Sequence, residues 1–361
     1  MSTSEAASEA TRDLRVVSLR PLVSPALLTD DLPLDPRGAH VVSSARDDIV
    51  RMLNRQDDRL FVVVGPCSVH HCGAALEYAE RLAALAARVA DDLRVVMRVY
   101  FEKPRTTVGW KGLINDPHLD GSFAVNEGLR LARQLLLDVI GMGLPAGCEF
   151  LDPITPQFFA DAVTWGAIGA RTTESQVHRQ LASGLSMPVG FKNGTSGDVQ
   201  VAVDAVRAAA HPHSFFGVTE QGLAGIVSTR GNLDCHVILR GGHDGPNYAA
   251  RSIQAALELL EVSKLPPRLV VDASHGNSSR DYRRQPVVIH DVAEQVASGE
   301  GGIVGAMIES FLVEGRQELG DPSGLTYGQS ITDACIGWDA TEATLEELAG
   351  AVRARRARAR N

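Results

Sequence analysis

The stretch FVVVGPCSVHHCGAALEYAERLAALAARVADDLRVVMRV (residues 61–99) contains one complete strand–helix–strand unit. Two short valine-rich runs, 61–66 and 93–99, flank an alanine- and leucine-rich amphipathic segment at Ala74–Ala90. Buried parallel strands are continuously apolar, whereas a helix that covers a sheet is apolar on one side only. The unit therefore predicts a parallel sheet whose strands are connected by helices.

The same alternation continues toward the C-terminus. Helical patterns are expected at Gly128–Met142, Asp198–Ala210, Ala249–Val262 and His290–Ser298. The candidate strands lie at 61–66, 93–99, 144–151, 166–173, 187–193, 235–242, 268–275 and 301–310. Eight such units predict an α/β fold of the (β/α)8 TIM-barrel class. A doubly wound open sheet is the alternative.

The remaining segments give the domain organisation. Residues 1–12 are rich in Ser, Ala and Glu and are expected to be disordered, and 13–59 form an N-terminal extension with a helix near Ala45–Asn54. Residues 60–346 form the barrel, and 347–361 form a C-terminal helix ending in a solvated, arginine-rich tail. Two connections are long, the loop at 100–127 and an inserted β-hairpin at about 211–234. Long loops in compact domains are usually functional.

Charge and cysteine content exclude several classes of protein. A formal net charge of −9 provides no basic field for nucleic acid or an anionic membrane. The five cysteines are irregularly spaced, which argues against a disulfide framework and favours the cytoplasm. The polar N-terminus lacks the apolar core of a signal peptide, and no apolar run is long enough to span a membrane.

Each candidate strand carries a charged or metal-capable side chain at or near its C-terminal end. In chain order these are Cys67, Arg98, Glu149, Arg171, Lys192, Arg240, His275 and Glu309. The C-terminal ends of barrel strands converge on one mouth, where active sites lie. Charged side chains are rarely buried without partners, so the series indicates a site more than packing. Cys67 alone would more often be an inert buried thiol, and Glu149 an ion-pair partner of the arginines.

The strand-end residues form two chemical sets. Arg98, Arg171, Lys192 and Arg240 are cationic and suit a small anion that carries both phosphate and carboxylate. Cys67, His275 and Glu309 are metal-capable, and Asp333 is a candidate fourth ligand. One thiolate, one imidazole and two carboxylates suit a divalent Mn, Fe, Co or Zn ion, and the mixed set favours a catalytic role.

Several long strings resemble the type I 3-deoxy-D-arabino-heptulosonate-7-phosphate (DAHP) synthases of the microbial, feedback-regulated kind. Among them are GPCSVH (65–70), MRVYFEKPRTTVGWKG (97–112), CEFLDPITPQ (148–157), DASHGNSS (272–279) and GAMIESFLVEGRQ (305–317). The resemblance runs from about Asp13 to about Arg356. It implies a cytoplasmic, homodimeric or homotetrameric transferase. Such an enzyme condenses phosphoenolpyruvate, erythrose 4-phosphate and water into DAHP and phosphate, the first step of the shikimate pathway to aromatic amino acids.

The resemblance also implies roles for individual residues. Cys67, His275, Glu309 and Asp333 look like the metal ligands, and Lys103, His275 and Cys67 are the candidate catalytic residues. The phosphoenolpyruvate site would comprise Arg98, Glu149, Ala170, Arg171, Lys192 and Arg240. The erythrose 4-phosphate site would comprise Lys103, Pro104, Arg105, Thr106 and Asp333. A metal-bound water, Lys103 or His275 could act as the general acid or base.

Feedback regulation is a further implication of the resemblance. The matching effector positions are Asp13, Pro156, Leu185, Ser186, Phe215, Gly217 and Val227. Glycine at 217 favours tyrosine over phenylalanine as the effector. Pro153 and Arg12 depart from the family pattern, and both departures weaken this expectation.

Three rival functions are open at the level of sequence. The first is 3-deoxy-manno-octulosonate 8-phosphate synthase, a similar barrel that uses arabinose 5-phosphate, against which the KPRTT string (103–107) argues. The second is a non-catalytic regulatory barrel, which would require a missing ligand or anion clamp. The third is a zinc-stabilised structural domain, which would unfold on chelation.

Overall fold

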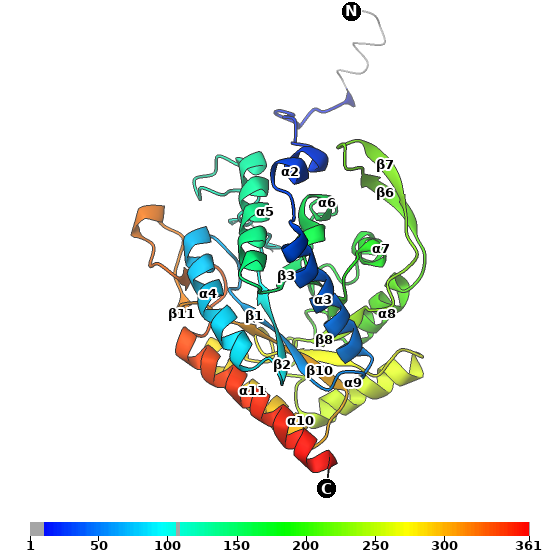
Figure 1. Cartoon of the computed structure of the whole chain (residues 1–361). Helices are drawn as coiled ribbons and strands as arrows, with labels where there is room; N and C mark the ends of the chain where they lie inside the picture. The colour runs from blue at the N-terminus through cyan, green and yellow to red at the C-terminus, as the bar shows by residue number, and fades with distance from the viewer. Residues whose placement is uncertain (1–10, 106–108, 361) are drawn as a thin grey trace, which may run out of the picture.

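The computed structural model describes residues 11–105 and 109–360. Eight parallel strands close into a barrel in the order β1-β10-β9-β8-β5-β4-β3-β2 (Figure 1). Their bounds are β1 Leu60–Gly65, β2 Leu93–Arg98, β3 Ala146–Glu149, β4 Trp165–Ile168, β5 Val189–Lys192, β8 His236–Leu239, β9 Leu269–Asp272 and β10 Ile303–Glu309. The predicted barrel is confirmed, and the open sheet is excluded because β1 pairs with both β2 and β10.

Helices surround the barrel and bury one side against it (Figure 1). They are α4 Cys72–Arg88, α5 Val125–Gly141, α6 Pro156–Phe159, α7 Gln176–Gly184, α8 Gln200–Ala209, α9 Ala250–Val262 and α10 Gln285–Ala297. The 3-10 turns η1 Ala160–Ala162 and η2 Tyr282–Arg284 adjoin α6 and α10. His71 caps α4 by accepting a hydrogen bond from the Ala74 backbone amide.

The N-terminal extension contains α2 Pro25–Asp31 and α3 Pro36–Leu53. Helix α3 closes the barrel at the end opposite the mouth, whereas α2 lies beside α6. Helix α3 is longer than the predicted Ala45–Asn54, because Asp35 caps it and Pro36 begins it. Its residues Ile49 and Met52 pack with Phe61 and Trp165 inside the barrel.

The predicted insertion is an antiparallel hairpin of β6 Ser214–Val218 and β7 Ala224–Ser228. Phe215 pairs with Val227 on its half-buried face, whereas Phe216 and Ile226 on the other face are 93% and 79% exposed. A smaller pair, β11 Val313–Arg316 with β12 Gln329–Ser330, follows β10 and encloses the turn η3 Pro322–Gly324. These last elements were not predicted.

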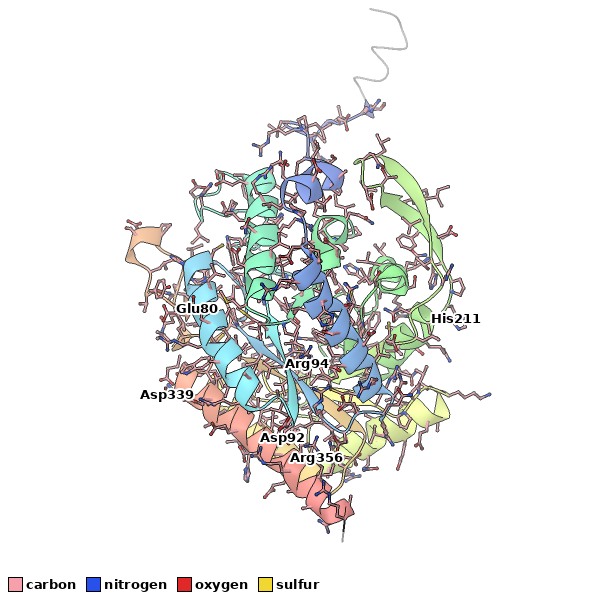
Figure 2. All side chains as sticks on the ribbon, viewed as in Figure 1. Glu80, Asp92, Arg94, His211, Asp339 and Arg356 are labelled. Carbon is pink, nitrogen blue, oxygen red and sulfur yellow. The ribbon has the colours of Figure 1, made fainter. Side chains whose placement is uncertain are left out.

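The arginine-rich C-terminus is helical rather than a solvated tail. Helix α11, Trp338–Ala359, packs on α10, and Arg356 pairs with Asp92 at 2.7 Å and with Asp58 at 2.6 Å. Figure 2 shows Arg356 and Asp92 together at this end of the molecule. The C-terminal helix predicted at 347–361 is confirmed, and the tail expected after it is wrong in that the helix continues to Ala359. Carboxylates preceding β1 and β2 bind Arg356, whereas Arg358 and Arg360 are exposed. Within the described residues, no helix combines the length and apolarity required to cross a bilayer.

Candidate active site

The predicted site residues lie at the C-terminal ends of the strands. Arg98, Glu149, Lys192 and Glu309 are the last residues of β2, β3, β5 and β10. Cys67, Ala170, Arg171, Arg240 and His275 follow β1, β4, β8 and β9 within a few residues, and Asp333 follows β12. Lys103, Pro104 and Arg105 belong to the loop after β2, whereas Thr106 lies outside the described residues.

Three of the four predicted metal ligands lie together. One ligand atom from each of Cys67, Glu309 and Asp333 is within 4.8 Å of the other two. The Cys67 Sγ is 3.5 Å from the Asp333 Oδ2. The His275 Nε2 lies 3.8 Å from the Glu309 Oε1, at the edge of this group. A thiol, two carboxylates and an imidazole around one point fit a borderline divalent cation.

Lys103 is the charged neighbour of this cluster. Its Nζ lies 3.1 Å from the Cys67 Sγ and donates to the Cys67 carbonyl at 3.3 Å. Burial and the Glu309 carboxylate raise the pKa of the Cys67 thiol to about 12. Burial opposes ionisation of Asp333, but Lys103 and His275 outweigh it and lower the pKa of this carboxyl. The protein therefore brings cations toward a group of ligands that repel one another when ionised.

The arginines of the mouth have unused donors. Arg98 is 1% exposed and donates to the carbonyls of Pro66 and Cys67 and to Glu309, but its buried Nη1 has no partner in the described structure. The buried Nε of Arg240 is also unpaired there. Burial, together with repulsion from Arg171 and Arg280, lowers the pKa of Arg240. Buried guanidinium groups with a free donor, one of them repelled by neighbouring cations, have the chemistry that suits an anion.

Asp272 is a site residue that the sequence analysis missed. Its carboxylate lies 2.9 Å from the Lys192 Nζ and 3.0 Å from the His275 Nδ1, and it accepts a hydrogen bond from the Ser274 hydroxyl at 2.6 Å. It therefore orients His275 so that the Nε2 faces Glu309. An aspartate ending the apolar run LVVD (269–272) was a usable signal, because such a carboxylate requires a buried partner.

Three asparagines join neighbouring strand ends and were also missed. The Asn193 Oδ1 accepts hydrogen bonds from the Arg240 backbone amide at 2.8 Å and from the Asn247 side chain at 3.2 Å. The Asn277 Oδ1 accepts a hydrogen bond from the backbone amide of Asn247 at 2.8 Å. This network fixes the backbone that carries Arg240. Side-chain amides within loops gave no signal in the sequence.

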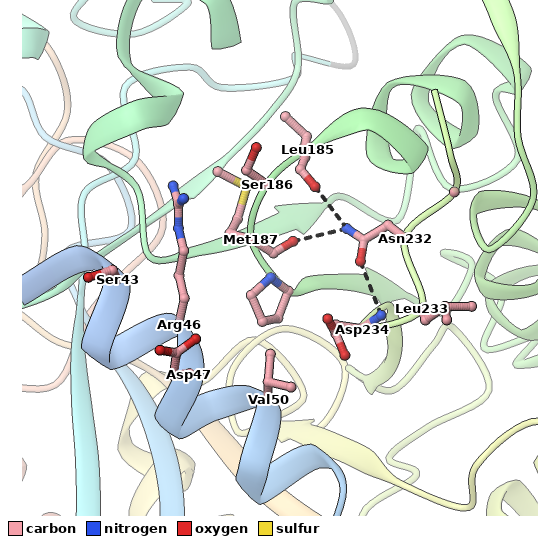
Figure 3. Close-up of a pocket in the computed structure, with 12 residues that line it drawn as sticks. Ser43, Arg46, Asp47, Val50, Leu185, Ser186, Met187, Asn232, Leu233 and Asp234 are labelled. Atoms are coloured by element: carbon pink, nitrogen blue, oxygen red, sulfur yellow. Dashed lines mark hydrogen bonds between the residues drawn. The ribbon is translucent and has the colours of Figure 1, made fainter. Parts of the chain in front are cut away.

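The predicted effector residues occupy several places. Phe215, Gly217 and Val227 lie on the half-buried face of the hairpin, Pro156 begins α6, and Asp13 is exposed near the N-terminus. Leu185 and Ser186 line a pocket of about 550 Å³ between α3 and the segments that precede β5 and β8 (Figure 3). Asn232 supports its rim by donating to the Leu185 and Met187 carbonyls. This pocket lies at the end of the barrel opposite the mouth, because its lining residues precede strands β5 and β8.

Comparison with known proteins identifies the family to which the chain belongs. The model of the DAHP synthetase I family matches residues 40–346. The chain belongs to this family. It is 57% identical over 344 residues to the Phe-sensitive phospho-2-dehydro-3-deoxyheptonate aldolase of Escherichia coli K12, covering 95% of this chain and 98% of that protein. It is 55% identical over 348 residues to the tyrosine-inhibited aldolase of Schizosaccharomyces pombe, covering 95% and 94%.

A solved structure of a similar enzyme has the same fold as this chain. The phospho-2-dehydro-3-deoxyheptonate aldolase of Francisella tularensis SCHU S4 superposes with a TM-score of 0.93 at 49% identity, covering 94% of this chain and 99% of that one. The predicted family, its barrel fold and the DAHP synthase activity, a transferase reaction of the shikimate pathway, are confirmed. The family is typically metal-dependent, and Cys67, Glu309 and Asp333 form a possible metal site.

Proposed function

We propose that the mouth of the barrel binds one divalent metal ion, phosphoenolpyruvate and erythrose 4-phosphate side by side. Cys67, His275, Glu309 and Asp333 hold the ion, which is Mn, Fe, Co or Zn. The observation that carries this proposal is the gathering of Cys67, Glu309 and Asp333 ligand atoms within 4.8 Å, beside arginines with unused donors. Cys67 and Glu309 are buried, and Asp333 stands exposed beside them. A buried thiol and carboxylate so close to a second carboxylate are stabilised if a cation joins all three.

Phosphoenolpyruvate fits the cationic part of the mouth. Arg171 and Arg240 bind its phosphate with the help of the Ala170 backbone amide, while Arg98 and Lys192 bind its carboxylate. Glu149 keeps these cations in place from the end of β3. The Nη1 of Arg98 and the Nε of Arg240 support this division, because each is a buried donor without a partner among the described residues.

Erythrose 4-phosphate fits the loop after β2. Lys103, Pro104, Arg105 and Thr106 receive it together with Asp333, whose carboxylate interacts electrostatically with Lys103 and Arg105. Support comes from Lys103, whose Nζ already contacts the Cys67 thiol, so the loop and the proposed metal ligands share one space. A sugar phosphate bound here would present its aldehyde close to the metal ligands.

The reaction joins C3 of phosphoenolpyruvate to the aldehyde carbon. A bound divalent ion would supply Lewis acidity toward the aldehyde oxygen. The arginine and lysine clamps hold the enol phosphate against the aldehyde, which replaces a bimolecular encounter by an oriented one. Lys103 or His275 delivers a proton to the new alkoxide, water adds at C2, and the C2–O bond to phosphate breaks. The products are DAHP and inorganic phosphate.

Acceptor choice and a single thiol substitution test this proposal. Phosphate release from phosphoenolpyruvate is expected with erythrose 4-phosphate and at least 100-fold more slowly with arabinose 5-phosphate, consistent with specific aldose recognition. Cys67→Ala is expected to abolish turnover, whereas Cys148→Ala, at another buried thiol, keeps the activity. Full activity of folded Cys67→Ala would remove the ligand assignment.

We also propose that the chain works in the cytoplasm as a feedback-inhibited dimer or tetramer. The extension at 13–59 and the hairpin are its regulatory parts, and tyrosine is its effector. Related enzymes are named Phe-sensitive and tyrosine-inhibited, so relatives of similar identity differ in effector. Inhibition by each aromatic amino acid at saturating substrate tests the choice, and no response to tyrosine would refute it.

Assembly is supported by two exposed apolar surfaces. One is the outer hairpin face with Phe216 and Ile226, and the other is the extended segment with Val17 and Leu19, which are 101% and 87% exposed. Apolar groups exposed in such numbers mark an interaction surface. A second copy of the chain is the partner we propose.

A further inference from the structure

Tyr100 connects the mouth to the interior of the barrel. It lies two residues after the end of β2, and its side chain is fully buried. The ring belongs to the interior cluster that includes Val96, Ala167 and Met307, so it extends from the mouth into the interior of the barrel. The guanidinium carbon of Arg98 lies 3.8 Å from the centre of this ring.

Arg98 is held on its edge by oxygens and on its face by Tyr100. Its Nε donates to the Pro66 carbonyl at 3.3 Å, and its Nη2 donates to the Cys67 carbonyl at 3.3 Å and to Glu309 at 3.1 Å. These bonds leave the Nη1 without a partner in the part of the chain that the structure describes. The oxygens fix one edge of the Arg98 guanidinium, and the Tyr100 ring prevents its plane from tilting into the interior of the barrel.

We infer that Tyr100 is a positioning residue, whose ring holds the Arg98 guanidinium by a cation–π contact in the orientation that receives the carboxylate of phosphoenolpyruvate. This inference rests on the proposed role of Arg98. A cation–π contact is strongest where water is excluded, and both side chains are buried. A guanidinium that is already ordered binds its ligand without the entropic cost of being immobilised. The ring therefore contributes to phosphoenolpyruvate affinity without contacting the substrate.

The ring, not the hydroxyl, carries this role. The Tyr100 hydroxyl is buried and makes no hydrogen bond with the described residues. Removing it leaves no partner unpaired, so Tyr100→Phe is expected to keep the phosphoenolpyruvate KM within about twofold. Tyr100→Met fills the space without a ring and is expected to raise that KM about tenfold. The erythrose 4-phosphate KM should not change in either variant.

A matched control separates positioning from packing. Phe61 is a fully buried aromatic residue of the same interior cluster, near the opposite end of the barrel, where it contacts His236. Phe61→Met is expected to lower the melting temperature without changing the phosphoenolpyruvate KM. An equal rise of that KM in Phe61→Met and Tyr100→Met would reduce Tyr100 to a packing residue and overturn the inference.

Fluorination tests the electrostatic part of the contact. Phenylalanine, 3,5-difluorophenylalanine and 3,4,5-trifluorophenylalanine are placed at position 100 of the metal-loaded full chain, and phosphoenolpyruvate binding is measured by calorimetry. Fluorine withdraws negative charge from the ring face with little change in size, so Kd should rise stepwise, about tenfold over the series. A flat series, or a large loss of affinity in Tyr100→Phe itself, would overturn the inference.

Arg98→Lys separates the proposed role of Arg98 as a carboxylate ligand from the role of Tyr100 as its positioning residue. If this variant keeps the wild-type phosphoenolpyruvate KM, Arg98 is not a carboxylate ligand, and both the assignment and the inference fail. If it raises the KM while the fluorinated series stays flat, the assignment stands and only the role of Tyr100 fails. The inference predicts a raised KM in Arg98→Lys together with a stepwise fluorination series.

Discussion

Glu102 is a buried carboxyl in the loop that carries Lys103. It is 3% exposed, and its Oε2 accepts a hydrogen bond from the Thr155 hydroxyl at 3.0 Å. Burial, opposed by that hydrogen bond, raises the pKa of Glu102 from 4.5 to about 8. The folded protein therefore holds a proton here that the unfolded chain releases near pH 4.5.

Stability is expected to fall as the pH rises through this window. Below pH 4.5 both states are protonated, and between 4.5 and about 8 the folded state binds the extra proton, so stability is lost at roughly 1.4 kcal/mol per pH unit at most. Glu102→Gln should flatten this dependence. Chemical unfolding from pH 5 to 8 measures it, with Glu258→Gln, at an exposed position on α9, as control. An unchanged pH profile in Glu102→Gln would contradict the prediction.

Asp272 contacts both Lys192 and His275. In Asp272→Asn, Lys192 loses its buried countercharge and His275 loses the carboxylate beside its Nδ1, which is expected to cost roughly 3–5 kcal/mol of stability and most of kcat/KM. Asp204→Asn removes an exposed pair with Arg207 and should change stability by less than about 0.5 kcal/mol. Urea unfolding and steady-state kinetics measure both variants. Similar small effects would show that Asp272 is dispensable.

At the residue scale, the sequence predicted side chains that end strands but not those that support them. Cys67, Glu309 and Asp333 were found because they interrupt or follow apolar runs. Asp272 and Tyr100 were missed because their importance lies in particular neighbours, Lys192 and Arg98. Those neighbours become adjacent only when the barrel closes.

At the element scale, ion pairs join the C-terminal part of helix α11 to the base of the barrel. Arg356 bridges Asp58 and Asp92. Arg356→Ala is expected to cost about 1 kcal/mol in low salt, and less in high salt because ions screen partly exposed pairs. Unfolding at two salt concentrations measures this, with exposed Arg358→Ala as control. A loss that does not depend on salt would mean that packing, not charge, holds the helix.

The outer face of the hairpin gives a second prediction at this scale. Phe216→Asp places a charge on the proposed assembly surface and should shift the protein toward smaller species, while the monomer stays folded. Sedimentation velocity measures the shift, and His211→Ala, at an exposed position beside the hairpin, is the control. Unchanged assembly of Phe216→Asp would exclude this face as the interface.

Element prediction was accurate where periodicity was strong. All eight barrel strands and the hairpin were found from their apolar runs. Helix α7 was missed, because QVHRQLASG is short and mixes polar with apolar residues. The predicted start of helix α3, at Ala45, is too late, although the Asp35 cap and Pro36 mark its true start.

At the scale of the whole molecule, chain closure creates the site. Cys67 and Asp333 are separated by 266 positions in sequence, yet their side chains lie 3.5 Å apart. A barrel accomplishes this because the C-terminal ends of its strands share one mouth. Sequence reasoning could place residues at that mouth, but their distances depend on register and loop conformation, which no pattern encodes.

The most direct test of the account is a metal titration of phosphate release from phosphoenolpyruvate and erythrose 4-phosphate. EDTA treatment is expected to abolish the release while circular dichroism keeps its folded spectrum. Addition of Mn, Fe, Co or Zn should then restore it at about one equivalent per chain. Full turnover by verified metal-free protein would contradict the account, and so would unfolding on chelation.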